Sequence, residues 1–201
     1  MSYAAIVRRR TVAYRRPGGA PLQRFGRLNQ NGVPTVFSVV GVERARSCDP
    51  AWYRVQLPLR PNGTTGWVRA AAVDVAPVHT RIVIHVRARR LELFRDGRLV
   101  LSTSISTGAP ETPTPLGRFY VKERLIPADP HGPWGPAALG ISAFSPLLKS
   151  WVQGGPVGIH GTNDPSAIGR PVSHGCIRLP NATMRKLFAS TLAGTPVIIV
   201  A

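Results

Sequence analysis

The chain has 201 residues, and its 26 Lys and Arg against 9 Asp and Glu give a formal net charge of +17 at pH 7. A hydrophobic content of 43% is enough for a core and excludes a disordered basic tail. The 20 Gly and 20 Pro predict many turns, which favours a β-rich fold over a helical bundle. The charge predicts a polyanionic neighbour: nucleic acid, an anionic membrane surface or an anionic cell-wall polymer.

Nucleic acid is the least favoured of these neighbours. Basic residues are spread over the whole chain, with one dense cluster at Arg8–Arg10, and no nucleic-acid-binding motif accompanies them. The longest apolar stretch, residues 33–42, is interrupted by Pro34 and Gly41, so we expect no transmembrane segment. No apolar secretory segment precedes the arginine cluster, so an export signal is not visible in this chain.

Short strands separated by turns are predicted for residues 1–78. The β-prone stretches are 36–42, 52–57 and a strand starting at 66, with a turn at Pro61-Asn62-Gly63 and a boundary near 76–78. Several short strands in this length predict a small barrel. The stretch Trp52-Tyr53-Arg54-Val55 with Gly66-Trp67-Val68 resembles the end of a bacterial SH3-like domain. We expect an accessory barrel that packs on its neighbour, with binding to the cell wall as the alternative.

Residues 79–201 show a second series of elements. Strands are expected at 81–86, 91–94, 99–105, 119–121 and 196–200, with Asp96-Gly97 as a hairpin turn. Residues 127–140 hold four Pro and three Gly, which predicts a long surface loop acting as a lid or binding loop. A short helix is expected to be capped by Asn181, to carry apolar residues up to Leu192 and to end at Gly194.

The residues that carry chemistry are concentrated in Ile159-His160-Gly161-Thr162 and Ser173-His174-Gly175-Cys176-Ile177-Arg178. A free thiol has a pKa of about 8.5, so a nearby imidazole that accepts its proton makes it a useful nucleophile. Gly175 lets the backbone turn tightly and approach a substrate closely. In a strand, positions 174, 176 and 178 share a face, which would bring imidazole and thiol side by side and let Arg178 meet a carboxylate.

Three other interpretations of Cys176 compete with a nucleophile. It could be an inert buried cysteine beside a structural histidine. It could bind zinc with His160 and His174, although the spacing fits no common zinc signature. It could form a disulfide with Cys48, the only other cysteine, which would silence the thiol.

The segment Ser-His-Gly-Cys-Ile-Arg at 173–178, preceded by His-Gly-Thr at 160–162, resembles the active-site signature of L,D-transpeptidases with the YkuD-type catalytic domain. The resemblance covers residues 79–201 and includes the 81–105 hairpin and Thr112-Pro113-Thr114-Pro115-Leu116-Gly117-Arg118-Phe119. The family pattern often has Asn two residues after the cysteine, where this chain has Arg178.

The resemblance implies a mainly β protein of two domains. An SH3-like accessory domain at 1–78 would precede a catalytic domain at 79–201, a mixed β-sandwich with a short C-terminal helix. The Cys motif would lie at one end of the sandwich under a lid loop.

The resemblance also implies a reaction and roles for residues. Cys176 would attack the third-residue carbonyl of a peptidoglycan tetrapeptide stem and release D-Ala, leaving a thioester. His174 would take the thiol proton, oriented by the backbone carbonyl of Ser173. The N–H groups of Gly175 and Cys176 would bind the oxyanion. The substrate would be positioned by His160, Gly161, Thr162 and Arg178.

An acceptor amine would resolve the thioester into a 3→3 crosslink, in the service of cell-wall biogenesis and cell shape. There are two alternatives. The protein could be an L,D-carboxypeptidase, which hydrolyses the same thioester, or a non-catalytic wall-binding protein. No metal or cofactor is implied. The expected partners are stem peptides, anionic wall polymers and carbapenem β-lactams. The expected location is extracytoplasmic, in the cell wall or periplasm.

Overall fold

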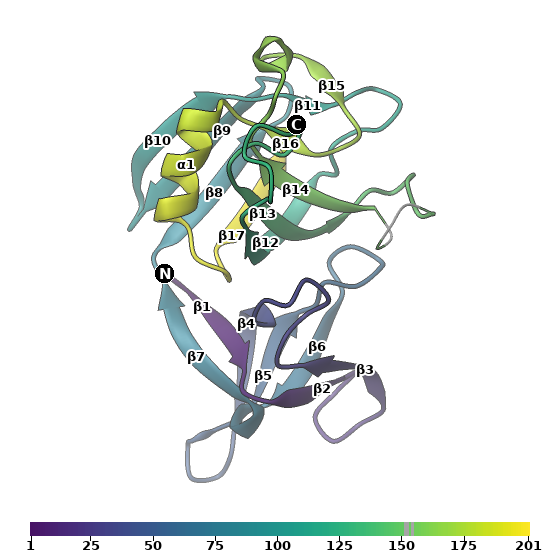
Figure 1. Cartoon of the computed structure of the whole chain (residues 1–201). Helices are drawn as coiled ribbons and strands as arrows, with labels where there is room; N and C mark the ends of the chain where they lie inside the picture. The colour runs from purple at the N-terminus through teal and green to yellow at the C-terminus, as the bar shows by residue number, and fades with distance from the viewer. Residues whose placement is uncertain (151–152, 154) are drawn as a thin grey trace.

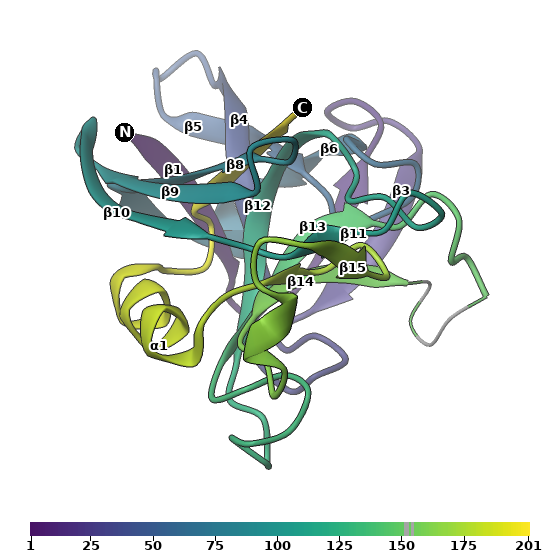
Figure 2. The same ribbon diagram turned by 90° about the horizontal axis from the view of Figure 1, so that it is seen from above.

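The computed structural model describes residues 1–150, 153 and 155–201. Two bodies of β structure lie one above the other in Figure 1: the N-terminal half (residues 1–78) below and the C-terminal half (residues 79–201) above. Seen from above, the strands of the N-terminal half lie behind those of the C-terminal half, and the loop between β12 and β13 extends away from both (Figure 2).

The N-terminal half is a seven-stranded antiparallel sheet in the order β3-β2-β6-β5-β4-β1-β7. Its strands are β1 Ser2–Val7, β2 Arg10–Tyr14, β3 Pro21–Gly26, β4 Val36–Arg44, β5 Pro50–Gln56, β6 Thr65–Arg69 and β7 Val73–Val78, with a 3₁₀ turn at Ala70–Ala72. The sheet surrounds its own core, in which Phe37, Val55, Leu57 and Val68 are fully buried. In this strand order β3 and β7 are the two edges, and the SH3-like resemblance stays a prediction.

The C-terminal half is a mixed eight-stranded sheet in the order β10-β9-β8-β17-β12-β13-β14-β16. The pairs β17–β8 and β14–β16 are parallel, and the other neighbours are antiparallel. Its strands are β8 Thr80–His85, β9 Arg90–Arg95, β10 Arg98–Ser104, β12 Gly117–Leu125, β13 Ala138–Phe144, β14 Pro156–His160, β16 Ile177–Arg178 and β17 Pro196–Val200. Strands β11 Thr107–Gly108 and β15 Pro171–Ser173 form a small parallel pair, and Pro165–Ala167 is a 3₁₀ turn.

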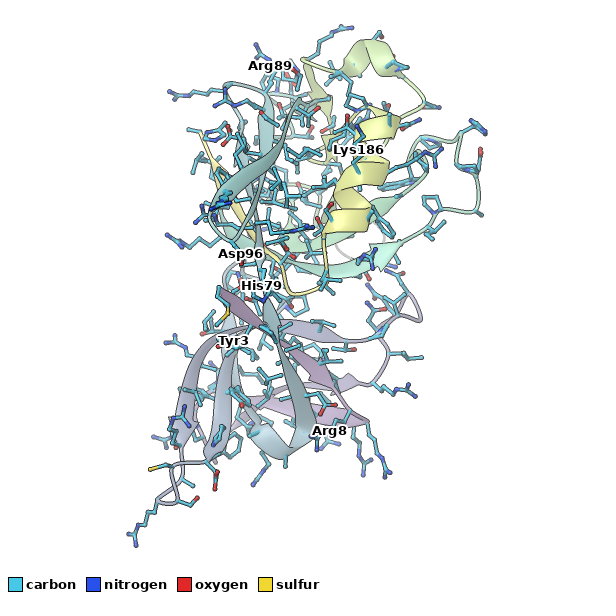
Figure 3. The ribbon with its side chains drawn as sticks, turned by 90° about the vertical axis from the view of Figure 1, so that its left-hand side faces the viewer. Tyr3, Arg8, His79, Arg89, Asp96 and Lys186 are labelled. Carbon is cyan, nitrogen blue, oxygen red and sulfur yellow. The ribbon has the colours of Figure 1, made fainter. Side chains whose placement is uncertain are left out.

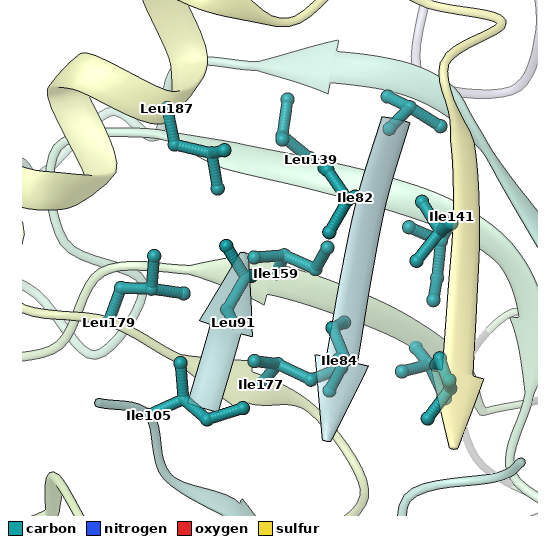
Figure 4. Close-up of a cluster of buried hydrophobic side chains, with 14 of the residues drawn as sticks. Ile82, Ile84, Leu91, Ile105, Leu139, Ile141, Ile159, Ile177, Leu179 and Leu187 are labelled. Carbon is teal, nitrogen blue, oxygen red and sulfur yellow. The ribbon is translucent and has the colours of Figure 1, made fainter. Parts of the chain in front are cut away.

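The two ends of this sheet face each other across one apolar core, which makes the half a β-sandwich. Alternation along β8 and β9 buries Ile82, Ile84 and Leu91, and these side chains meet residues of β13, β14 and β16 (Figure 4). Helix α1, Asn181–Ser190, covers one side through Met184 and Leu187. The core therefore fixes the register of β14 and β16, which carry the site.

The two halves are joined by polar contacts to β12 and to the end of β13. Gln56 Nε2 donates to the Arg118 carbonyl at 2.7 Å. The amide of Asn62 pairs with both backbone groups of Phe144, at 2.8 and 2.9 Å. His79 Nδ1 and Asp96 Oδ1 lie 2.7 Å apart near the junction of the halves (Figure 3). The bonds of Gln56 and Asn62 cross between the halves and hold them in a defined relative position, whereas the His79–Asp96 contact lies within the C-terminal half.

Positive charge is distributed over both halves. Figure 3 shows Arg8 on the lower half and Arg89 and Lys186 on the upper half, with basic side chains projecting between them. Arg8 is paired with Asp74, whose Oδ1 lies 2.7 Å from Nη2. In the described part of the chain, no helix has the length and apolarity needed to cross a bilayer.

The strands predicted from hydrophobic alternation are confirmed. The expected 119–121 segment is the centre of the longer β12, and the expected 36–42 segment is β4. Two predicted features differ from the structure. The loop is shorter than 127–140, because Ala138 already begins β13, where it pairs with His160. The helix ends at Ser190, and Leu192 lies beyond it with 57% of its surface exposed.

The prediction that Asn181 caps the helix is wrong. Pro180 occupies the N-cap position and Asn181 is the first helical residue. The side-chain Oδ1 of Asn181 instead accepts a hydrogen bond from the Thr162 N–H at 2.8 Å. The Asn181 side chain therefore accepts a hydrogen bond from a residue outside the helix, and not from the N–H groups of the first helical turn.

We expect Leu139→Ala to lower the free energy of unfolding by about 2–5 kcal/mol, because Leu139 is fully buried in the sandwich core. Leu99→Ala is the matched control, since Leu99 is 53% exposed and its truncation should cost under about 0.5 kcal/mol. Urea unfolding followed by tryptophan fluorescence measures both. Equal losses in the two variants would contradict this placement of the core.

Candidate active site

Strand β14 carries the centre of the site. Val157 and Ile159 point into the sandwich core, so Gly158 and His160 face the other way. His160 lies opposite Ala138 of β13 on one side and Arg178 of β16 on the other. The sheet therefore places an imidazole and a guanidinium next to each other on one face.

His160 is buried and held in one orientation. Its Nδ1 lies 2.6 Å from the Gly161 carbonyl oxygen, so Nδ1 carries the proton and donates it. The Trp134 ring, from the loop between β12 and β13, covers the imidazole at a centroid distance of 4.6 Å. Burial lowers the pKa of His160 to about 4, against the raising effect of the Gly161 carbonyl, and the Arg178 charge lowers it further. The ring is therefore neutral at pH 7, with its lone pair on Nε2.

Cys176 lies beside β14. Its Sγ accepts a hydrogen bond from the Gly158 N–H at 3.4 Å. Burial raises the pKa of the Cys176 thiol, while the Gly158 N–H and the Arg178 charge lower it. Because burial is the largest effect, the resting group is a thiol, and it needs a base to become a nucleophile.

The imidazole and the thiol meet at Gly158. A methyl group placed on Gly158 would lie 3.9 Å from His160 Cδ2. Gly158 is therefore the common neighbour of the two groups: its N–H binds Sγ, and the His160 ring lies on the side that a Cβ would occupy.

Two threonines hold the loop that carries Cys176. Thr112 Oγ1 donates to the Ser173 carbonyl and Thr114 Oγ1 donates to the Gly175 carbonyl, each at 3.0 Å. In a trans peptide the N–H points opposite to the C=O. The two bonds therefore turn the N–H groups of His174 and Cys176 away from the threonines.

Gly175 makes the sharp turn in this loop with φ of +110°, a region that favours glycine. Ser173 Oγ closes the turn: it accepts from the Gly175 N–H at 3.1 Å and donates to the Cys176 carbonyl at 2.5 Å. The thiol is consequently presented by a fixed loop between β15 and β16.

Comparison with known proteins now identifies this arrangement. A family model described as the L,D-transpeptidase catalytic domain, YkuD, matches residues 79–199. The chain belongs to this family.

Individual relatives agree with that assignment. The chain is 37% identical over 119 residues to the protein named L,D-transpeptidase YkuD of Bacillus licheniformis, which covers 59% of this chain and 64% of the relative. It is 35% identical over 123 residues to the YkuD protein of Bacillus subtilis, covering 61% of this chain and 66% of the relative. The chain thus spans just under two thirds of the length of these curated relatives.

One solved structure supports the fold, and a second is similar in sequence. An L,D-transpeptidase from Mycobacterium smegmatis superposes with a TM-score of 0.50 at 18% identity, over 84% of this chain and 90% of that one. The catalytic domain of the Enterococcus faecium L,D-transpeptidase is 29% identical, with a TM-score of 0.45 over 62% of this chain and 100% of that one.

Within the family's Ser-His-Gly-Cys segment, His174 lies in the loop between β15 and β16. Residues 174–176 lie outside the strands, so alternation does not align His174 with Cys176, and the imidazole of His174 is exposed. The Ser173 carbonyl, expected to orient that ring, accepts from the Ala109 N–H at 2.8 Å and from Thr112. The His160 ring is oriented by the Gly161 carbonyl.

The other predicted residues are placed as follows. Thr162 is buried and its hydroxyl is used locally, accepting from the Asp164 N–H at 3.0 Å. Gly161 fits under the loop of Pro136, where a Cβ would collide with the side chain of Asn181. Arg178 is anchored through both backbone groups to Ser106, at 2.9 and 3.0 Å. Its buried Nε has no hydrogen-bond partner among the described residues, which leaves one donor for a bound molecule.

The geometry bears on two of the competing interpretations of Cys176, the disulfide and the zinc site. Cys48 and Cys176 are both free thiols, and Cys48 is exposed in the N-terminal half. Among residues 1–150, 153 and 155–201, no three His, Cys, Asp or Glu side chains gather as metal ligands would, so His160, His174 and Cys176 do not form the zinc site considered above.

Thr112, Thr114 and Trp134 are site residues that reasoning from the sequence missed. The two threonines belong to the Thr-Pro-Thr-Pro stretch of the family resemblance, but their bonds span 61 positions along the chain. Trp134 lies in the predicted lid loop, where a single tryptophan among prolines and glycines was the available signal.

The low pKa of His160 predicts a pH-dependent stability. The unfolded chain takes up this proton near pH 6.5 and the folded chain near pH 4, so stability is present above pH 6.5 and is lost as the pH falls toward 4. We expect this residue to account for a loss of roughly 3 kcal/mol between pH 7 and pH 4. Urea unfolding of the native chain and of His160→Gln at both pH values measures it. A loss of the same size in His160→Gln would contradict the assignment.

Proposed function

We propose that this protein is an L,D-transpeptidase of peptidoglycan. It would cleave a tetrapeptide stem after its third residue, hold the acyl group on Cys176 as a thioester and transfer it to an amine to form a 3→3 crosslink. The observation that carries the proposal is a thiol held on the Gly158 N–H, two residues along β14 from a buried neutral imidazole fixed by Gly161, in a member of this family.

In this mechanism His160 is assigned as the general base because its ring is neutral and fixed, and His174, the base expected from the sequence, is the alternative. Nε2 of His160 takes the Sγ proton while Sγ bonds to the carbonyl carbon at the L-centre of the third residue. The Gly161 carbonyl stabilises the imidazolium that forms, through the Nδ1–H bond at 2.6 Å. Proton transfer and attack occur together, because burial disfavours both the thiolate and the imidazolium in the resting site.

The negative charge formed on the carbonyl oxygen needs donors. We expect the Cys176 N–H to be one of these donors. Thr114 binds the Gly175 carbonyl, so the N–H on the other side of that peptide points away from Thr114. The Gly175 N–H, also expected as a donor, is bonded to Ser173 Oγ. Arg178, whose charge acts on both Cys176 and His160, supplies a cation and one unpaired N–H to this region or to a substrate carboxylate.

The intermediate then collapses. The C–N bond to D-Ala breaks, His160 returns its proton to the leaving amine, and the thioester remains on Cys176. An acceptor amine attacks the thioester, His160 takes a proton from that amine, and the sulfur leaves and is reprotonated. Water in place of the amine would make the product that of an L,D-carboxypeptidase. The names of the relatives favour transfer to an amine.

The two halves act as two domains in this proposal. Each has a separate hydrophobic core and a separate sheet. The SH3-like resemblance of residues 1–78 and the net charge of +17 support contact with anionic wall polymers outside the cytoplasm. The N-terminal half would hold the catalytic half near its substrate.

Cys176→Ala is expected to abolish D-Ala release and crosslinked dimer from a disaccharide tetrapeptide, because no other group can form the thioester. Muropeptide analysis by mass spectrometry measures both products and separates transfer from hydrolysis. Cys48→Ala is the control and should retain full activity, since Cys48 is exposed in the other half. A carbapenem should add its mass to the peptide that contains Cys176. Activity retained in Cys176→Ala would refute the mechanism.

The choice of base is tested by comparing two glutamine variants. His160→Gln should lower kcat by roughly 100-fold or more, because it removes the general base. His174→Gln should lower kcat by a smaller factor, because His160 carries the proton in the proposed mechanism. The pH profile of acylation and the thermal melting of each variant exclude a loss through unfolding. A larger loss of kcat in His174→Gln would restore His174 as the base.

A further inference from the structure

A row of cross-strand neighbours connects the thiol to a buried carboxylate. Glu123 of β12 pairs with Gly140 of β13, and Gly140 pairs with Gly158 of β14. The register of β14 with β16, continued by one residue, brings Gly158 beside Cys176, whose Sγ binds the Gly158 N–H. The two central positions of the row are glycines, so no side chain stands between the thiol and the carboxylate.

The Glu123 carboxylate lies over Gly140, its neighbour on β13. A Cβ on Gly140 would collide with Oε1 of Glu123. With neighbouring strands about 4.8 Å apart, the carboxylate is roughly 10 Å or less from Sγ. A group bonded to Sγ can therefore extend along the row to Glu123.

A pocket of about 410 Å³ opens on this row. Gly140 and Gly158 form part of its floor, Trp134 and Ile126 of the lid loop border it, and Glu123 lines it. Glu123 is the single charged side chain among its described lining residues. Lys122, which is bonded to the same carboxylate, lines a different pocket. The ionisable group that lines this pocket is thus a carboxylate paired with Lys122, in a protein of net charge +17.

Glu123 is held in place from both halves. Lys122 Nζ lies 2.9 Å from Oε1, and Asn29 and Asn31 donate to Oε2 at 2.7 and 2.9 Å. A bulge in the β12–β13 ladder between Val121 and Glu123 lets the consecutive residues 122 and 123 pair instead of pointing to opposite faces. These three donors leave one of the four lone-pair positions of the carboxylate open, on Oε1.

We propose that Glu123 binds the free amino group at the end of the third residue's side chain in the acyl donor. The inference rests on the proposed function and names the part of the substrate that this site selects. An ammonium on a four-carbon stem, attached through the thioester carbon, reaches about 8–9 Å from the sulfur, which brings it within hydrogen-bond distance of Oε1. Lysine and diaminopimelate share this amine, and the apolar floor suits their methylene stems.

The proposal gives the N-terminal half a direct part in substrate selection. Asn31 lines the pocket, and Asn29 and Asn31 fix the carboxylate oxygen that does not face the open position. A carboxylate bonded to an ammonium in a buried pocket discriminates strongly against a neutral analogue, because the analogue leaves the carboxylate partly unsatisfied.

The test measures D-Ala release from three tetrapeptide stems that differ only at the third residue: lysine, Nε-acetyl-lysine and norleucine. In the native chain we expect kcat/KM to fall at least tenfold for the acetylated and norleucine stems. Glu123→Gln should reduce kcat/KM for the lysine stem by a similar factor and bring the three stems within about twofold of each other. Glu43→Gln is the control: it removes one exposed acidic side chain from β4 and should keep the native preference.

Each outcome is decisive. Equal kcat/KM for the three stems in the native chain, or an undiminished preference in Glu123→Gln, would overturn the role of Glu123. The native-chain comparison stands even if Glu123→Gln fails to fold, and carbapenem acylation of Cys176 in that variant reports whether the site is intact. Release of D-Ala from none of the stems would instead overturn the proposed function itself.

Discussion

The hydrogen bond from His160 Nδ1 to the Gly161 carbonyl is the constraint on which the site depends. It fixes the tautomer, so the lone pair lies on Nε2, and it fixes the ring edge that faces Gly158. The bond is protected by burial under Trp134, and the same burial keeps the imidazole neutral at physiological pH.

The fixed imidazole is useful only because the thiol is equally fixed. The Cys176 loop is held through its carbonyls by Thr112 and Thr114, and through its turn by Ser173. These are hydrogen bonds between segments that the sandwich core brings together, so their geometry follows from the packing of β13, β14 and β16. Both reacting groups are uncharged at rest, which suits a site that generates charge only when a substrate is present.

The charge distribution separates two tasks. The arginine-rich surface attracts polyanions within about a Debye length of 8 Å, a contact without geometric detail. The pocket beside Gly140 and Gly158 instead holds one carboxylate, that of Glu123, which three donors fix in one orientation. In the proposed function the surface places the protein at the wall, and the pocket selects the stem. Asn29 and Asn31 link the two halves in this proposal, since they belong to the N-terminal half and hold the carboxylate of Glu123 in the pocket of the C-terminal half.

The sequence by itself determined the β-rich class, most of the strands and the Ser-His-Gly-Cys loop, because hydrophobic alternation and short motifs are local properties. Cys176 was recognised in this way, as was Asp96-Gly97 as a turn. The tertiary structure decided what each polar group bonds to. His160 is 16 positions from Cys176 in sequence, yet both neighbour Gly158; Asn181 has a capping side chain, yet binds Thr162. Glu123 gave no signal, because its row of neighbours exists only after β12, β13 and β14 have paired. The physical reason is that hydrogen bonds and burial depend on partners distant in sequence, and the packed core alone brings those partners together.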